Sequence, residues 1–176
     1  TQCLPVPVLK GQSWQISPRY NFTDLIPKLW PNIAQDFEFG FDFKRTDNAF
    51  TVGELIYYNS LVTIFQFMGG YNINYDNPKL LIKGKAEVFA SPFGIGCSMS
   101  QNSYNYLRAD ADSSYIYLRF ASDFTYYLMK GIDLQAKLKG QVANGTLLPI
   151  EMYGIGGVNS VRGYTDRALN ADNALL

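Results

Sequence analysis

Phenylalanine at every second position constrains the fold of this chain more than any other feature. Residues 36–44 read Asp-Phe-Glu-Phe-Gly-Phe-Asp-Phe-Lys, so four aromatic side chains alternate with charged residues and one glycine. Successive side chains of a β-strand point to opposite faces, whereas a helix brings together residues three or four apart. The alternation therefore predicts a strand with one apolar and one polar face.

The same alternation recurs along the chain. It is found in residues 14–22, 60–75, 80–88, 115–124 and 133–142, and a last short strand is expected at 150–155. In the segment 60–75 the polar face begins with two apolar residues, Val62 and Ile64. The pattern predicts about seven strands and no helix.

Turn residues separate these segments. Glycine, proline, asparagine and aspartate predict turns at 27–32, 46–48, 76–78, 130–131 and 144–145, and a longer connection at 91–113. Short and long connections that alternate in this way are typical of membrane β-barrels, which have tight turns on one rim and longer loops on the other.

Composition favours a barrel in a membrane over a soluble sheet protein. The chain has 13 Tyr and 12 Phe, yet it contains no apolar run long enough for a membrane-spanning helix, which needs about 18 residues. Tyrosines gather near strand ends, at Tyr57, Tyr58, Tyr71, Tyr75, Tyr126 and Tyr127, as the aromatic girdles of a barrel do. A soluble sandwich or calyx would also explain the alternation, and that alternative stays open on these grounds.

Composition also argues against several functions. The chain has no histidine, and its 15 basic side chains equal its 15 acidic ones. The commonest general base and metal ligand is therefore missing, and no basic stripe points to nucleic acid. We expect no metal, no cofactor, no small-molecule substrate and no enzymatic activity. Cys3 and Cys97 could form a disulfide or remain free thiols, and their spacing decides neither.

The motif that points to a family lies near the C-terminus. Gly156 and Gly157 are followed by Ser160, Val161, Arg162, Gly163 and Tyr164, and later by the pair Asp172 and Asn173. This pattern resembles the long loop of the outer-membrane transporters of two-partner secretion, the haemolysin-activator type. The Val-Arg-Gly core is shared with the barrel-assembly insertases of the same superfamily. The serine before the core and the later Asp-Asn pair favour the secretion branch.

The resemblance implies an all-β fold, an antiparallel transmembrane β-barrel. Residues 1–176 would supply about seven of sixteen strands, as a partial barrel domain that ends in the Val-Arg-Gly-Tyr loop. The implied location is the bacterial outer membrane, and the implied partners are its lipids and a secreted polypeptide. The family's full proteins also carry periplasmic domains, so we expect this chain to be a fragment. The open alternatives are an outer-membrane insertase and a soluble ligand-binding barrel.

The resemblance also implies roles for charged residues. Those on the polar faces of the strands would line the lumen: Arg19, Lys83, Lys85, Glu87, Arg119, Asp123, Lys137 and Lys139. In the family the loop folds into the lumen, where Arg162 needs a carboxylate and Tyr164 packs against the wall. The family's carboxylate follows the loop on a later strand, so we expect Arg162 to lack that partner within these residues.

Overall fold

The computed structural model describes residues 7–23, 32–52, 55–92, 101–129, 131–158 and 160–176. Its long strands are β1 (Pro7–Ile16), β3 (Ile33–Val52), β4 (Leu55–Asn77), β5 (Leu80–Ser91), β6 (Tyr115–Met129) and β7 (Ile132–Ala143). Its short strands are β2 (Arg19–Thr23), β8 (Tyr153–Ile155), β9 (Leu169–Ala171) and β10 (Ala174–Leu175). The helix α1 covers Gln101–Leu107.

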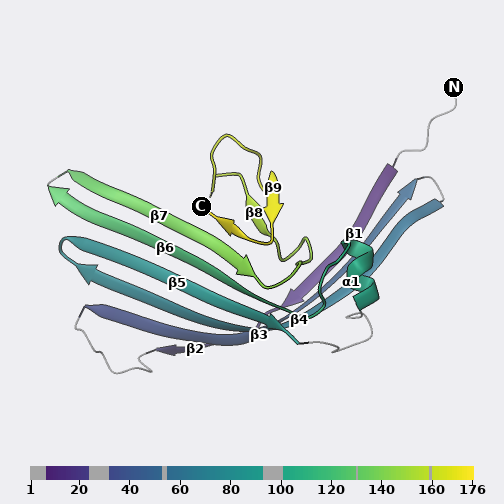
Figure 1. The fold of residues 1–176 in the computed structure, drawn as a ribbon, viewed down its shortest axis with the longest axis horizontal. Helices are drawn as coiled ribbons and strands as arrows, with labels where there is room; N and C mark the ends of the chain where they lie inside the picture. Colours follow the sequence, from purple (N-terminus) through teal and green to yellow (C-terminus); the bar gives the residue numbers. More distant parts are fainter. Residues whose placement is uncertain (1–6, 24–31, 53–54, 93–100, 130, 159) are drawn as a thin grey trace.

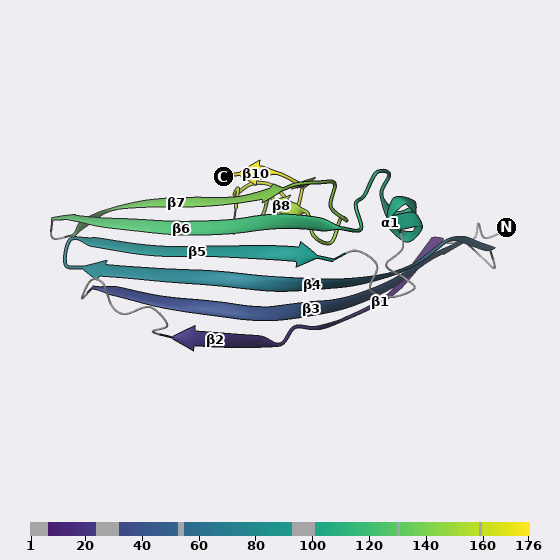
Figure 2. The same cartoon turned by 60° about the horizontal axis from the view of Figure 1, so that its bottom comes forward.

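One curved sheet dominates the structure. Its strands follow the order β1-β3-β4-β5-β6-β7-β10, and β2 pairs with β3 in line with β1. Neighbouring strands are antiparallel, and the sheet bends into a trough with the last part of the chain on its concave side (Figure 1). Figure 2 shows the strands lying side by side from β2 to β7. The antiparallel all-β fold with about seven strands is confirmed, and closure into sixteen strands stays a prediction.

The convex face of the sheet carries exposed aromatic side chains. Phe39 is 50%, Phe41 39% and Phe67 53% exposed. The ring of Phe41 packs against Phe65 of the neighbouring strand, with 5.6 Å between the ring centroids. Such cross-strand aromatic pairs stabilise a sheet, but they leave an apolar band facing outward. The alternation in the sequence thus correctly predicted the two faces.

The hairpin of β3 and β4 is longer than the sequence predicted. The two strands have 20 and 23 residues, about twice the 9–11 needed to cross a bilayer. The turn expected at 46–48 is wrong, because these residues belong to β3 and pair with β4. Asp47 lies opposite Leu61 and Asn48 opposite Ser60. Pairing along a continuous ladder overrides the turn preference of a short Thr-Asp-Asn segment.

The prediction that the chain has no helix is also wrong. Helix α1 lies in the connection between β5 and β6 and has seven residues, too few to show a helical period in the sequence. Its Tyr104 is fully buried, and the helix contacts β4. Within the described ranges, no helix has the length and apolar character needed to cross a membrane.

The remaining predicted turns and strands vary in outcome. The turn after β4 is confirmed, and so are Gly131 (φ +85°) between β6 and β7 and the bend after β7. The strand expected at 150–155 is shorter, as β8, and it pairs with β9 outside the main sheet. Cys3, Cys97, most of the turn at 27–32 and the side chains of Tyr57 and Tyr58 lie outside the described residues.

An apolar cluster on the concave side explains Val62 and Ile64. These residues point inward with exposures of 4% and 2%, under side chains that come from two connections. The β5–β6 connection contributes Tyr104 and Ala111, and the segment after β7 contributes Leu147 and Leu148. The cluster is completed by Met68, Phe89, Tyr115 and Tyr117. The concave face is therefore polar along most of its length and apolar where chain segments cover it.

Candidate functional site

The segment from Asn144 to Asn173 folds back over the concave face of the sheet, and we call it the inner loop (Figure 1). Its first part, residues 146–152, is the stem. Leu147 and Leu148 of the stem are buried in the apolar cluster. A turn follows, in which the amides of Glu151 and Met152 donate to the Leu148 carbonyl at 2.8 and 3.2 Å. This turn directs Glu151 toward the sheet.

Glu151 joins the stem to four strands of the sheet, since its Oε2 also accepts a hydrogen bond from the Gln66 side chain of β4 at 3.5 Å. The Glu151 Oε1 lies 2.6 Å from the Lys44 Nζ of β3, and its Oε2 accepts a hydrogen bond from the Tyr117 hydroxyl of β6 at 2.6 Å. Its backbone carbonyl accepts from the Arg119 guanidinium at 2.8 Å and from the Gln141 amide of β7 at 3.2 Å. Glu151 itself is 0% exposed. The stem is therefore fixed by polar as well as apolar contacts.

The polar contacts continue along the concave face. The side-chain amide of Gln66 donates to Asp42 at 2.9 Å and accepts from the Tyr115 hydroxyl at 3.0 Å. Asp42, 2% exposed, also accepts a short hydrogen bond from Arg19, and Lys44 lies 3.8 Å from it. Buried polar groups are stable only when their hydrogen bonds are satisfied, and this cluster satisfies them across β2, β3, β4 and β6.

A second ionic contact holds the far end of the inner loop. Arg108, just after α1, donates two parallel hydrogen bonds to the Asp172 carboxylate, at 2.6 and 2.8 Å. It also donates to the Leu147 carbonyl at 2.6 Å, while the Leu147 amide donates to Asp172 at 3.0 Å. We call this arrangement the Arg108–Asp172 clamp. It ties the stem, the end of the loop and the β5–β6 connection together.

The clamp gives a pH-dependent contribution to stability. The hydrogen bonds from Arg108 hold the pKa of Asp172 below its ordinary value of 3.8, against the opposing effect of burial. A lowered folded-state pKa means that the contribution is complete above 3.8 and is lost only as pH falls below that value. We expect Asp172→Asn to lower urea stability in detergent at pH 6, and the difference from wild type to vanish toward pH 2. A difference that persists unchanged at pH 2 would contradict this assignment.

Asn173 and the residues after it return the chain to β7. The Asn173 side-chain oxygen accepts from the Ala143 amide at 2.7 Å. Ala174 then pairs with Gln141 and Leu175 with Gly140. The Asp-Asn pair thus occupies the point where the loop becomes a strand, and both of its side chains accept hydrogen bonds from backbone amides.

The glycines and Ser160 shape the tip of the inner loop. Gly156 and Gly157 have φ values of +122° and +84°, and a Cβ at Gly156 would collide with the Thr165 carbonyl. Ser160 Oγ accepts from the Gly156 amide and donates to its carbonyl, both at 2.7 Å. Gly163, with φ +93°, also needs the conformational freedom of glycine. The tip is therefore a tight turn held by its own backbone.

The other motif side chains are partly or largely exposed. Val161 is half-buried, Arg162 is exposed, and Tyr164 is 64% exposed. Tyr164 therefore does not pack against the concave face as the resemblance implied. Arg162 has no hydrogen bond or ion pair with any residue that the structure describes. It shares a hollow of about 440 Å³ with Lys137, Lys139 and Ser160.

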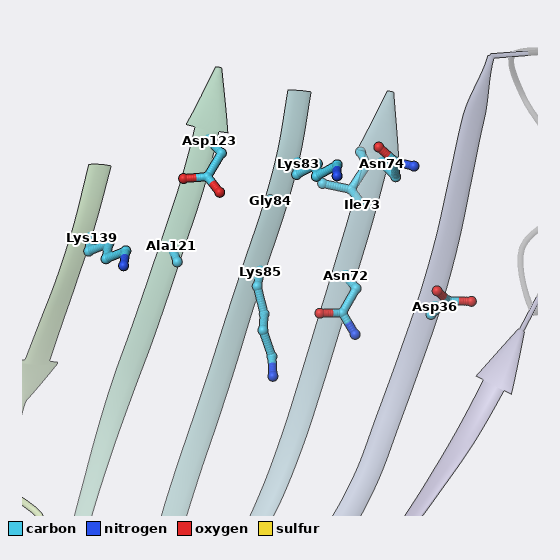
Figure 3. A pocket seen from close by; sticks show the side chains of 10 residues that line it. All are labelled: Asp36, Asn72, Ile73, Asn74, Lys83, Gly84, Lys85, Ala121, Asp123 and Lys139. Atoms are coloured by element: carbon cyan, nitrogen blue, oxygen red, sulfur yellow. The ribbon is translucent and has the colours of Figure 1, made fainter. Parts of the chain in front are cut away.

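Four of the eight charged residues predicted to face the lumen lie around one open hollow on the concave face. A cavity of about 480 Å³ is lined by Lys83 and Lys85 of β5, Asp123 of β6 and Lys139 of β7 (Figure 3). Asp123 stands between Lys83 and Lys137 in the cross-strand register. The structure thus brings both signs of charge together on one face. That they line a conduit stays a prediction.

The remaining predicted residues occupy other positions on the same face. Glu87 lies 2.8 Å from Lys85. Arg19 belongs to the buried polar cluster, and Arg119 lies under the stem with its guanidinium 4.9 Å from the Tyr117 ring centroid. The sequence did not reveal the groups that receive the inner loop: Asp42, Lys44, Gln66, Arg108, Gln141 and Glu151. Lys44 and Asp42 stood on a predicted polar face, but nothing in their spacing indicated a distant partner.

Comparison with known proteins decides the family. The model of the haemolysin secretion/activation protein ShlB/FhaC/HecB family matches residues 38–176, most of the chain. The chain belongs to this haemolysin secretion/activation family. A solved structure, CdiB from Escherichia coli, is similar in fold, with a TM-score of 0.74 at 12% sequence identity. The similarity covers 95% of this chain but 30% of CdiB, so the chain spans less than a third of that protein. A search of curated proteins found no match.

Family membership confirms part of the sequence-based predictions. The haemolysin secretion/activation family consists of outer-membrane β-barrel transporters, which confirms the expected resemblance and the prediction that the chain is not an enzyme. The likeness to CdiB confirms that the curved sheet has the fold of part of such a barrel. Secretion and activation of partner proteins such as haemolysin are properties of the family.

Proposed function

We propose that residues 1–176 are part of an outer-membrane barrel that exports a partner polypeptide from the periplasm to the cell surface. The observation that carries this proposal is the contrast between the two faces of the sheet. The convex face is aromatic and exposed, which suits lipid, and the concave face is charged and carries the inner loop. Acidic and basic groups alternate around the hollow, and such a wall can pass a chain without binding it tightly.

The inner loop lies where it could control passage through the proposed pore. Its stem covers the concave face at Glu151, and its exposed tip carries Arg162 beside Lys137 and Lys139 of β7. A loop in this position occupies space that a translocating polypeptide would need. The proposal therefore assigns the charged concave face to substrate passage and the loop to control of that passage.

Photo-crosslinking in the complete protein tests this proposal. A crosslinking residue is placed at Lys85 on the concave face, and at Phe67 on the convex face as the matched control. During export, the position at 85 should crosslink to the partner polypeptide, and the position at 67 should not. Equal crosslinking at both positions, or none at 85 while the partner reaches the surface, would refute the proposal. Crosslinks from 85 to other outer-membrane proteins would instead favour an insertase.

A further inference from the structure

The concave face of the sheet contains two largely buried cations, Lys44 and Arg119. The inner loop supplies hydrogen-bond acceptors to both. The Lys44 side chain is 11% exposed and lies 2.6 Å from Glu151. Its other carboxylate neighbour, Asp42, is 3.8 Å away and already accepts hydrogen bonds from Arg19 and Gln66. Without Glu151, Lys44 would keep its charge in a largely dry site with only this distant, shared carboxylate. A buried charge that loses its close partner is strongly unfavourable.

Arg119 is a second cation that depends on the stem for a close partner. Its guanidinium lies over the rings of Tyr117 and Phe89, at 4.9 and 5.6 Å from their centroids. It donates to two neutral oxygens, the Gln141 side chain at 2.6 Å and the Glu151 carbonyl at 2.8 Å. One stem residue therefore supplies a carboxylate for Lys44 and a carbonyl for Arg119. The neighbouring Tyr117 donates its hydroxyl hydrogen to the same carboxylate.

We propose that Glu151 is a positioning residue, whose carboxylate docks the stem of the inner loop into a cationic site built by Lys44, Tyr117 and Arg119. The stem stays against the sheet because its departure would take the close carboxylate from Lys44 and a carbonyl acceptor from Arg119. Docking then fixes where the tip, with Arg162, stands over the concave face. Only the consequence for export rests on the proposed function, since the docking itself concerns this chain alone.

Hydrogen exchange of the stem amides measures docking directly. In the complete protein in detergent, Glu151→Gln should accelerate exchange in residues 147–152 at least tenfold, because the amide carries no charge to balance Lys44. Lys44→Met should also accelerate it, by leaving Glu151 unpaired. The double variant should exchange more slowly than the product of the two single effects predicts, because both charges then leave together. Independent effects that multiply would overturn the proposal.

A matched control separates this role from a general loss of charge. Glu87→Gln removes a carboxylate that is also paired with a lysine, on the same face but outside the inner loop. It should leave stem exchange within about twofold of wild type, whereas an increase equal to that of Glu151→Gln would overturn the proposal. Unchanged stem exchange in Glu151→Gln would also overturn it.

Conductance in planar bilayers distinguishes this proposal from the function above. Glu151→Gln should raise the mean conductance of the complete protein, because an undocked stem no longer holds the loop over the wall. Faster stem exchange without a change in conductance or export would refute the pore proposed above and support the docking role of Glu151. A higher mean conductance without faster exchange of the stem amides would refute the docking role.

Discussion

Leu148→Ala is expected to release the stem of the inner loop from the sheet. Leu148 is 1% exposed and packs in the apolar cluster under α1. Truncation of a buried leucine costs about 2–5 kcal/mol, since it removes apolar contacts and leaves a cavity. Exchange of the stem amides should therefore accelerate by about 30-fold or more, as 1.4 kcal/mol corresponds to about tenfold.

The same chain offers a matched control for this truncation. Leu169→Ala makes the identical chemical change in the same loop, at a side chain that is 63% exposed. It should change stem exchange by less than about threefold, because surface substitutions usually alter stability by about 0.5 kcal/mol or less. Equal effects of the two variants would show that the apolar cluster does not hold the stem.

Phe67→Arg should destabilise the protein in phospholipid vesicles by up to about 4 kcal/mol, because it places a cation on the face that we propose meets lipid. The control is Asn72→Arg on the same strand. Asn72 lines the hollow on the concave face, where an added cation stays in water and should cost little (Figure 3). Urea unfolding in vesicles measures both variants. Equal losses would contradict the assignment of the convex face to lipid and would favour a soluble barrel.

What the sequence could predict here is the local pattern. The alternation in residues 36–44 depends on neighbours two apart, so it correctly assigned the outward phenylalanines of β3 and the inward Asp42 and Lys44. The Gly-Gly and Ser-Val-Arg-Gly-Tyr segments pointed to the family because their residues also lie close together in the sequence. A strand's two faces are set by a period that is visible in any short stretch.

What the sequence could not predict depends on distance along the chain. Lys44 and Glu151 are 107 positions apart, and Arg108 and Asp172 are 64 apart. No local pattern specifies which of many polar residues will meet across the concave face. Helix α1 was missed for a related reason. It is short, and it is stabilised by the burial of Tyr104 against distant segments rather than by its own helical preference.

The junction at Asn173 sets which face of the sheet each side chain of the two-residue strand β10 takes. Asn173 caps the Ala143 amide, and Ala174 enters the ladder opposite Gln141. Side chains alternate between faces, so inserting a single residue between Asn173 and Ala174 would exchange the faces that Ala174 and Leu175 take. The inner loop thus fixes more than the space over the wall. Through one hydrogen-bonded junction it also decides which side chain of β10 lies on the concave face of the sheet and which on the convex face.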